Sequence, residues 1–360
     1  MYLLEMIYWE SKITCFDEES KENIRISAAE GNSQILVALN TAPHDEQAIF
    51  AVNERFMDVQ AAWQEDRRGV VAFLFIGLMY FLQYQIFFNL VLPGIRSISS
   101  GIGPMGYPLT TEGYIFAPLS ILVWLVANIV LFRFGWRWIR LEIFTQRRLV
   151  IRFNRLTRQV HINRPSYAGG IVTFPWESTV ADISGGDKGS RLGDGVLALV
   201  WPARYSGAGF DDLSLVGGTL SDRDRAEALW EYIRRYMEEG INSVPSPTRL
   251  RSTFPWPWDS VRSTLSFMKP SWHNGDKGMV LTFALLLSPL LLMHSICHWL
   301  SLLLCWPTWW PRIIRRAGLP GAPVPKLTTA DDYGPEMAAK LRASAVKVVD
   351  KSESSVGRPT

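Results

Sequence analysis

Three side chains in an apolar run near the end of the chain have the types and the spacing of a metal site. His294, Cys297 and His298 occupy positions i, i+3 and i+4, which share one face of a helix. Imidazole and thiolate are good ligands for zinc or copper, and Cys305 would supply a fourth ligand about two turns further on. The same polar side chains are also typical of packing against another helix or of the membrane interface. We favour packing, so the sequence predicts neither a metal nor another cofactor.

Residues 101–106 spell GIGPMG, which matches the dinucleotide-binding motif GxGxxG. That motif works where a strand leads into it and a helix N-terminus behind it faces the pyrophosphate. Here the neighbouring segments are long apolar runs, so the match indicates a loop. The sequence contains no GxSxG, HExxH or CxxC motif, and the carboxylates of residues 141–240 are sparse. We therefore expect that the protein is not an enzyme.

Arginines are concentrated in residues 133–164, where nine stand against one acidic residue, Glu142. Such a run can bind anionic lipid headgroups or a protein partner, but it can also simply hold membrane helices in one orientation. Orientation alone is the slightly favoured interpretation. The net charge of the whole chain is only +3, which argues against nucleic acid as a partner. The candidate lipid or partner contacts are the five arginines at the start of the expected soluble domain, namely Arg147, Arg148, Arg152, Arg155 and Arg158.

Membrane helices must precede and position these arginines. Residues 70–92 carry no charge, and at 1.5 Å per residue a helix of this length spans about 34 Å, enough to cross a bilayer core of about 30 Å. A second apolar run covers residues 114–132, so a two-helix transmembrane hairpin is predicted over residues 70–135. Arginines flank the hairpin on its outer sides, whereas the loop 93–113 holds a single one. The positive-inside rule therefore places both ends of the hairpin in the cytoplasm and the loop outside.

Four polar residues lie within the two spans. They are Gln83, Gln85, Asn89 and Asn128. Gln85 and Asn89 stand at positions i and i+4 and are expected to hydrogen-bond across the hairpin or to a partner subunit. Polar side chains in membrane helices more often join helices by hydrogen bonds than conduct ions.

Residues 141–240 predict a compact cytoplasmic domain that is rich in strands. Seven short strand candidates, separated by turn residues, are LEIFT, LVIRFN, RQVHIN, GIVTFPW, STVADIS, GVLALVW and FDDLSLV. The periodicity then changes to that of an amphipathic helix, with Ser221 as its expected cap and Gly240 at its end. The predicted fold class is a membrane α-helical hairpin plus an α+β domain. In that domain a small antiparallel β-barrel or sheet is capped by one C-terminal helix, as in pleckstrin-homology-like folds.

The other segments are less informative. Residues 1–69 are polar and end in an expected short helix, FMDVQAAWQEDRRG, and residues 241–277 form a connector rich in Pro and Trp that returns to the membrane surface. Residues 278–306 are a third uncharged run, interrupted by Pro289, which is either one span or a re-entrant hairpin bent at that proline. Three arginines beyond this run favour a cytoplasmic C-terminus. Residues 307–360 are expected to be a linker and a flexible tail, with a short helix near residues 335–349.

Four stretches make the chain similar to a known family. They are RFNRLTRQVHINR, VTFPWES, LWEYIRRYMEEG and WPRIIRRAGLP. They resemble an uncharacterised bacterial family of two-transmembrane proteins that are commonly found beside type VI secretion genes. The likeness covers about residues 70–320 and brings no catalytic residues with it. It implies a multi-pass protein of the bacterial inner (cytoplasmic) membrane, associated with antibacterial secretion.

Three functional hypotheses follow. The resemblance favours a non-enzymatic immunity or accessory protein that binds a secreted effector. The arginine run favours a scaffold that binds membrane lipids and holds its domain on the inner leaflet. The third apolar run, bent at a proline, is also compatible with a membrane-active toxin. The sequence leaves the oligomeric state and the identity of the protein partner open.

Overall fold

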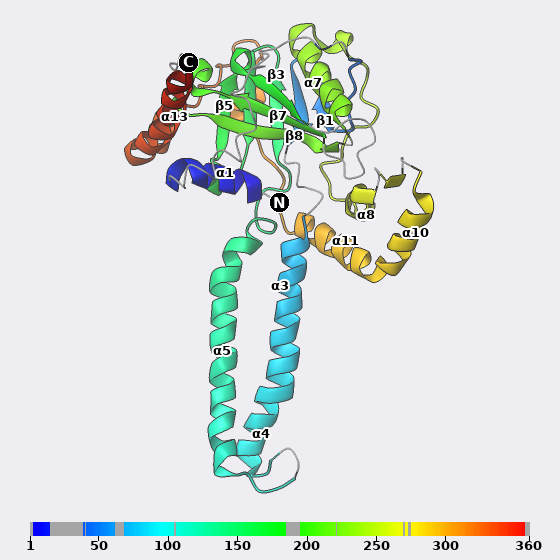
Figure 1. Cartoon of the computed structure of the whole chain (residues 1–360), viewed down its shortest axis with the longest axis vertical. Coiled ribbons are helices and arrows are strands. Elements are labelled where there is room, and N and C mark those ends of the chain that lie inside the picture. Colours follow the sequence, from blue (N-terminus) through cyan, green and yellow to red (C-terminus); the bar gives the residue numbers. More distant parts are fainter. Residues whose placement is uncertain are drawn as a thin grey trace.

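The computed structural model of the chain describes residues 3–14, 39, 41–61, 68–103, 106–184, 195–220, 222–268, 271–272 and 275–356. Two long antiparallel helices form a hairpin, and a domain of strands and shorter helices lies at one end of it (Figure 1). The two sides of the hairpin are long and apolar enough to cross a membrane. The chain therefore has the architecture of a membrane protein with a mixed α+β domain.

The first side of the hairpin is a continuous helical segment, Val70–Ser100, and the second is α5, Thr111–Ile139. The first side consists of α3 (Val70–Tyr80), a π-helical segment η2 (Phe81–Val91) and α4 (Leu92–Ser100). Both predicted spans are thus confirmed as helices. The expectation that the loop begins at residue 93 was wrong. Pro93 lies in the first turn of α4, where its missing N–H is tolerated because the hydrogen-bonding pattern changes there from π to α.

One polar pair joins the two sides of the hairpin, but it is not the pair that was expected. The Nε2 amide of Gln83 donates to Oδ1 of Asn128 at 2.8 Å. Asn89 and Gln85, which were expected to bond across the hairpin or to a partner subunit, are hydrogen-bonded to each other within the same helix. The hairpin is therefore held across its apolar interior by a side-chain amide bond, which membrane helices use in place of a hydrophobic driving force.

Five antiparallel strands form the larger sheet, in the order β1 to β5. They are β1 (Ile49–Val52), β2 (Phe56–Gln60), β3 (Val150–Asn154), β4 (Gln159–Asn163) and β5 (Ile171–Pro175). A three-stranded antiparallel sheet follows, with β6 (Val180–Ser184), β7 (Gly195–Trp201) and β8 (Asp212–Leu220). Six of the seven predicted strands are confirmed.

Three expectations about this domain were wrong. The strands of the described residues form two open sheets and no closed barrel, because the chain leaves the first sheet at Pro175 and makes the 3-10 turn η4 (Trp176–Ser178) before β6 begins. LEIFT is a turn after α5 and not a strand. The segment expected to be a helix from Phe56 onward begins with β2, which pairs with β3, so the sheet extends beyond residues 141–240.

Helix α7 (Arg223–Glu238) covers the smaller sheet and is the helix predicted after the strands. Its predicted apolar face is buried, with Trp230 packed against Trp176 at 5.7 Å between ring centroids. Its cap is Asp222, whose carboxylate accepts from the Arg225 N–H; Ser221, the predicted cap, lies outside the described residues. Gly240 ends the helix with φ +105°, a conformation that favours glycine.

Both termini contribute helices to the domain. Helix α1 (Leu3–Thr14) places Trp9 in the main hydrophobic core, and α13 (Pro335–Val356) packs beside α1. A helix near the C-terminus was predicted, but its place in the core was not. The shorter elements are η3 (Ser166–Ala168), α6 (Ala203–Ser206), η5 (Ile241–Ser243), η6 (Ser266–Met268), α12 (Arg312–Arg316) and η7 (Ala330–Tyr333).

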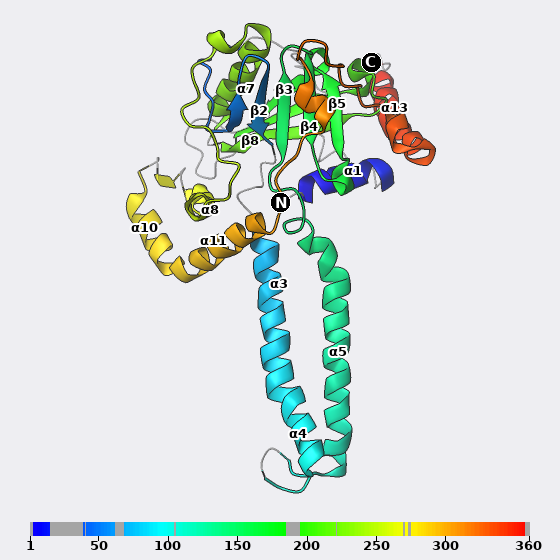
Figure 2. The ribbon, with the colours of Figure 1, turned by 180° about the vertical axis from the view of Figure 1, so that it is seen from behind.

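The third apolar run is two helices that meet at a sharp bend. Helix α10 (Lys277–Leu286) and α11 (Ser288–Leu303) are inclined by 76° to each other. The break is at Leu287, two residues before Pro289, as expected for a proline that begins a helix. Helix α11 packs against α8 (Pro257–Thr264) and against α3 (Figures 1 and 2). The bend favours the predicted hairpin-like alternative over a straight span.

Candidate functional site at the base of the hairpin

The structure does not bring the five predicted arginines to one surface. Arg152 is buried and forms a bidentate ion pair with Asp58, with both N···O distances 2.7 Å. Arg158 pairs with glutamates of η4 and α7, and Arg155 lies half-buried against Gly240. The other two, Arg147 and Arg148, lie at the base of the hairpin, by which we mean the end where α3 begins and α5 ends, next to the domain. The sequence shows how many arginines are present, but it does not show which of them form ion pairs or hydrogen bonds within the fold.

Arg68 occupies the centre of the hairpin base and is 1% exposed. Its guanidinium donates to the carbonyl of Glu142 from Nε at 3.2 Å and from a terminal nitrogen at 2.6 Å. It also donates to the carbonyl of Arg147 and to Sγ of Cys305. One side chain therefore joins the start of α3, the turn after α5 and the end of α11. We call this set of contacts the Arg68 bracket.

Glu142 complements Arg68 at the same place. Its buried carboxylate accepts from the backbone N–H of Ala72, in the first turn of α3, at 3.0 Å. The first N–H groups of a helix have no partner within the helix and carry partial positive charge, so a carboxylate there is stabilising. The last carbonyls of a helix carry partial negative charge, and a cation there is stabilising. The guanidinium of Arg68 lies beside the carbonyls that follow α5. Each span is thus capped by a charge that comes from the neighbourhood of the other.

Gly69 lets α11 approach this base closely. A Cβ on Gly69 would lie 2.5 Å from the backbone N of His298, and its φ is +95°. Only glycine has neither the side-chain volume nor the conformational preference that would prevent this contact. The position of α11 beside Arg68 therefore depends on the backbone geometry of Gly69 as well as on the hydrogen bonds of Arg68.

The histidines of α11 make the polar packing contacts that the sequence favoured. His298 Nδ1 and Ser260 Oγ are 2.9 Å apart, and His294 Nδ1 and Thr264 Oγ1 are 3.0 Å apart. Cys305 lies at the Arg68 bracket and not beside the histidines. Within the part of the chain that the structure describes, no three His, Cys, Asp or Glu side chains are grouped to hold a metal ion. The shared helix face is used for packing on α8.

The chain after α11 returns to the domain through Arg147 and Arg148. The Arg147 guanidinium donates to the carbonyls of Leu302 and Cys305, each at 3.0 Å. The Thr308 hydroxyl bonds both backbone groups of Arg148. Burial lowers the pKa of the Arg147 guanidinium from its ordinary value, but an arginine stays charged at neutral pH. These two predicted contact residues therefore bind the chain's own backbone.

Residues 307–330, which we call the strap, cover the polar face of the larger sheet (Figure 2). Alternate residues of β3, β4 and β5 point into the apolar core, and most of those between them are polar. On the strap side, Val150 packs in a small apolar cluster with Trp310 and Ile314. Side-chain amides on this face donate to strap carbonyls, from Asn154 to Ala317, from Gln159 to Pro325 and from Asn163 to Trp309. Both faces of this sheet are thus buried.

His161 lies under the strap and is fully buried. Its Nδ1 is 2.9 Å from Thr173 Oγ1, and its ring lies edge-to-face with Trp310. Burial, assisted by the nearby Arg152 charge, lowers the pKa of His161 to about 3. The imidazole is therefore neutral in the folded protein at physiological pH.

A second buried charge cluster fixes α1 to the domain. Asp212 accepts from Lys12 at 2.8 Å and from Arg164 at 2.6 Å, and all three side chains are buried. Burial on its own would raise the pKa of Asp212, but the two cations hold it at about 2. Such a triad serves to position α1, since each charge is compensated within the fold.

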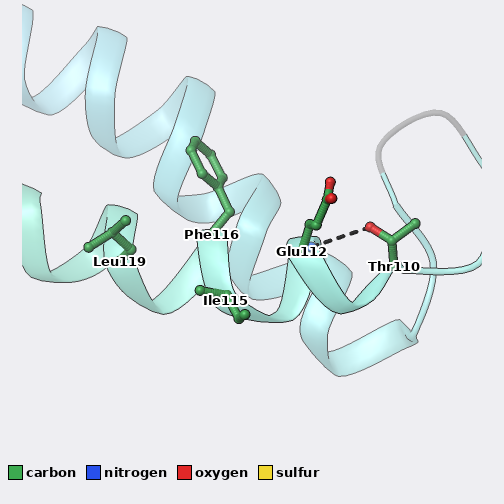
Figure 3. Close-up of a pocket in the computed structure, with 6 residues that line it drawn as sticks. Thr110, Glu112, Ile115, Phe116 and Leu119 are labelled. Carbon is green, nitrogen blue, oxygen red and sulfur yellow. Dashed lines mark hydrogen bonds between the residues drawn. The ribbon is translucent and has the colours of Figure 1, made fainter.

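The far end of the hairpin has a shallow hollow of about 480 Å³ (Figure 3). It is lined by the first turns of α5, where Ile115, Phe116 and Leu119 provide apolar side chains and Glu112 provides the charge. The Thr110 hydroxyl caps α5 by accepting from the Gly113 N–H. The neighbouring turn exposes Tyr107. This hollow lies at the end of the hairpin farthest from the buried ion pairs.

A family model described as a family of unknown function, DUF6708, matches residues 127–318 of the 360. The match runs from the second half of α5 to the end of α12. It covers more than half of the chain. The protein belongs to the DUF6708 family. No curated protein and no solved structure matches the chain.

The DUF6708 match contains most of the hairpin base but not Arg68. Glu142, Arg147 and Cys305 lie inside the matched residues, whereas the side chain that joins them comes from before α3. Sequence reasoning treated Arg68 only as a charge that orients the first span. Its position directly before an uncharged run was the available signal, and nothing local shows that its partners are 74 and 237 residues away. The uncharacterised family expected from the resemblance is confirmed, while its link with type VI secretion stays a prediction.

Proposed function

We propose that this DUF6708 protein is a non-enzymatic binding protein of the bacterial inner membrane, and that its partner is a type VI secretion effector. In this proposal it acts as an immunity or accessory protein. The observation that supports it is the Arg68 bracket, which fixes the sheet domain in one position relative to the two spans. A domain held in this way presents a constant surface to a partner at the membrane.

The ionisable groups inside the domain favour binding over catalysis, because the fold uses them to hold its own elements together. Asp58 is neutralised by Arg152, and Asp212 by two cations. Glu231 on α7 pairs with Arg234 and with Arg235, and these pairs lower the pKa of Glu231 to about 2. The low pKa values of Asp212 and Glu231 make these two carboxylates poor proton donors at neutral pH.

The turn at the far end of the hairpin is the surface we propose for an effector that acts outside the cytoplasm. Tyr107 is 73% exposed and Ile102 51%, next to the apolar hollow lined by Phe116. Exposed aromatic and aliphatic side chains are typical anchors of a protein interface. An effector that acts in the cytosol would instead contact the sheet domain.

An intoxication assay tests this function. Each effector candidate encoded beside the gene is produced in the cytoplasm or in the periplasm, with and without this protein. We expect protection against one effector in one compartment. Failure to protect against any of them would contradict the immunity role, and a fall in membrane potential when this chain is produced alone would favour a toxin.

Two variants show which surface is used. Tyr107→Ala changes the far turn, and Leu156→Ala is a matched control, since Leu156 is 56% exposed on the turn between β3 and β4. If the partner binds in the periplasm, Tyr107→Ala reduces protection and Leu156→Ala does not. Protection that survives Tyr107→Ala would place the contact on the domain.

A lipid-binding scaffold is the second candidate, and a different set of arginines favours it. Arg133, Arg137 and Arg140 are exposed along the last turns of α5, at the domain end of the hairpin. Cations at this level attract anionic headgroups by about 1 kcal/mol each. We expect Arg137→Gln with Arg140→Gln to reduce the anionic lipid that co-purifies with the full chain, as measured by mass spectrometry. Unchanged lipid content would contradict the scaffold role.

A further inference from the structure

We propose that α10 and α11 form a re-entrant membrane element that enters the leaflet on the domain side and returns without crossing the bilayer. We call the two helices, Lys277–Leu303, the elbow. The elbow is an interaction surface, and its partner is the hydrocarbon of a single leaflet. This inference does not depend on the identity of any protein partner.

Both ends of the elbow are attached to the same side of the molecule. Before α10, the connector is tied to the sheet by the Arg251 N–H, which donates to the Ile49 carbonyl, and α8 packs on α11. After α11, Trp306 exchanges backbone bonds with Thr145 and Arg147, in the turn that follows α5. The chain therefore leaves the domain and comes back to it. In both views the bend points along the hairpin, toward its far end (Figures 1 and 2).

The lengths and directions of the two helices fit one leaflet. The ten residues of α10 extend about 15 Å, which is about half of a hydrocarbon core of about 30 Å. The sixteen residues of α11 extend about 24 Å, but α11 runs obliquely to the hairpin in both views, so it descends by less than its length (Figures 1 and 2). The elbow ends beside the start of α3, because the last turns of α11 contact the backbone of Gly69. This end of the elbow therefore lies at the level where the first span enters the apolar layer, and the bend lies near the middle of the bilayer at the deepest.

The bend is the most exposed apolar part of the elbow. Leu285 is 78% exposed and Leu286 is 74% exposed, and Leu290 and Leu292 follow on the other side of the break. The polar side chains of α11 point the other way, since His294 and His298 bond to α8. Apolar side chains outside and polar ones inside are what a lipid-facing helix pair requires.

The backbone at the bend can be accommodated in hydrocarbon. The Leu287 N–H donates to the Phe283 carbonyl and the Leu291 N–H to the Leu287 carbonyl, each at 2.9 Å. Pro289 has no N–H to satisfy. Non-helical backbone is costly in lipid because its polar groups are unpaired, and these two bonds and the proline reduce that cost at the bend.

Aromatic and cationic side chains mark the water side of the elbow. Trp256 and Trp258 are stacked at 4.9 Å and are both exposed at the start of α8. The Lys277 ammonium lies 5.8 Å from the Trp272 ring at the start of α10, and Trp306 is exposed beyond α11. Trp and Lys are enriched where membrane helices meet the headgroups. This rim favours a lipid leaflet over a second copy or another protein as the occupant of the bend.

Cysteines added one at a time to the full chain test the proposal. They replace Lys277 before the elbow, Leu286 at its bend and Arg312 after it, with Tyr107 at the far turn as the marker of the opposite side. Each cysteine is added to a parent variant that carries Cys15→Ser. The two cysteines that remain in this parent, Cys297 and Cys305, are buried, and its labelling is subtracted as the control. A membrane-impermeant maleimide is applied to spheroplasts and to inverted membrane vesicles.

We expect Lys277→Cys and Arg312→Cys to react from one side and Tyr107→Cys from the other. Leu286→Cys should react at least tenfold more slowly than Lys277→Cys from either side. Reaction of Lys277→Cys and Arg312→Cys from opposite sides would show a crossing and overturn the proposal. Rapid reaction of Leu286→Cys would place the bend in water and overturn it too.

A spin label distinguishes lipid from a protein cover. The label is attached to Leu286→Cys in detergent, and the chain is then reconstituted at high dilution in phospholipid vesicles. We expect oxygen dissolved in the bilayer to relax the label at least fivefold more than an aqueous nickel complex does. Protection from both relaxants would mean that protein covers the bend and would overturn the proposal. Tyr107→Cys carrying the same label provides the aqueous reference.

Discussion

Replacing Arg68 by methionine should loosen the base of the hairpin while leaving both spans helical. Methionine fills similar volume but cannot donate to the carbonyls of Glu142 and Arg147 or to Sγ of Cys305. A buried polar group left without its partner costs about 1–3 kcal/mol. A hydrogen bond to a charged donor contributes about 1.5–3 kcal/mol. Because two carbonyls lose such a donor, we expect the opening of the base to become easier by about 3–5 kcal/mol.

The thiol of Cys305 reports this opening directly, because it is 3% exposed and contacts Arg68. If labelling by N-ethylmaleimide requires the base to open, 3–5 kcal/mol corresponds to an increase of roughly 10²- to 10⁴-fold in the labelling rate, at about 1.4 kcal/mol per tenfold. The loss of a cation beside a thiol disfavours the reactive thiolate. Faster labelling can therefore come only from opening. Mass spectrometry of the labelled peptides separates Cys305 from Cys297.

Two variants control this experiment. Arg68→Lys keeps the charge but lacks the planar fork of donors, so its labelling rate should lie between those of the parent and of Arg68→Met. Arg137→Met removes an arginine whose side chain is 76% exposed and whose carboxylate neighbour, Glu10, is 4.0 Å away, so it should change the rate less than threefold. If Arg68→Met also leaves labelling of Cys305 within threefold of the parent, the bracket does not hold the base together and our reasoning is wrong.

Three further predictions concern the domain and the hairpin. Because burial and a neighbouring guanidinium lower the pKa of His161 from an ordinary 6.5 to about 3, the unfolded state binds the extra proton between these values. Thermal stability should therefore rise with pH from 3 to 6.5 and then level off, and His161→Gln should flatten that slope; parallel profiles would contradict this. Asn128→Leu removes the bond to Gln83 and should lower the free energy of unfolding in bicelles by about 0.6–1.7 kcal/mol, whereas no loss would mean that the amides are satisfied separately. Gly195→Ala places a Cβ 2.0 Å from the backbone carbonyl of the α7 cap, so it should cost about 1–3 kcal/mol, while Gly218→Ala, with nothing within 4 Å, should cost less than 0.5 kcal/mol. Equal melting temperatures for the two glycine variants would refute the clash.

The sequence predicted those elements whose stability is decided locally. An uncharged run as long as residues 70–92 has few alternatives to a membrane helix, and α5 follows from the same rule. The apolar period around Trp230 predicted α7, the alternation of polar and apolar residues predicted β4, and the short apolar run GVLALVW predicted β7. The polar packing of His298 was also predictable, since its i, i+4 neighbour lies on the same helix face.

The structure differs from the sequence-based predictions where contacts between distant residues decide the outcome. β2 has apolar residues at a spacing that also suits a helix, and it becomes a strand because β3 offers it a complete edge of backbone partners. For the same reason the five candidate arginines do not form one surface. Arg152 is paired by Asp58, which lies 94 residues away, and Arg158 by Glu238, which lies 80 residues away.

The sequence by itself determined that the chain has two apolar spans, a strand-rich region and an amphipathic helix after it, because each of these follows from the burial preference of neighbouring residues. Tertiary structure alone decided that Arg68 joins the hairpin to the domain and that the N-terminal segment completes the larger sheet. It also decided that both ends of the elbow lie on one side of the molecule. These features depend on contacts between residues up to 237 positions apart, and such contacts form only when the whole chain has packed.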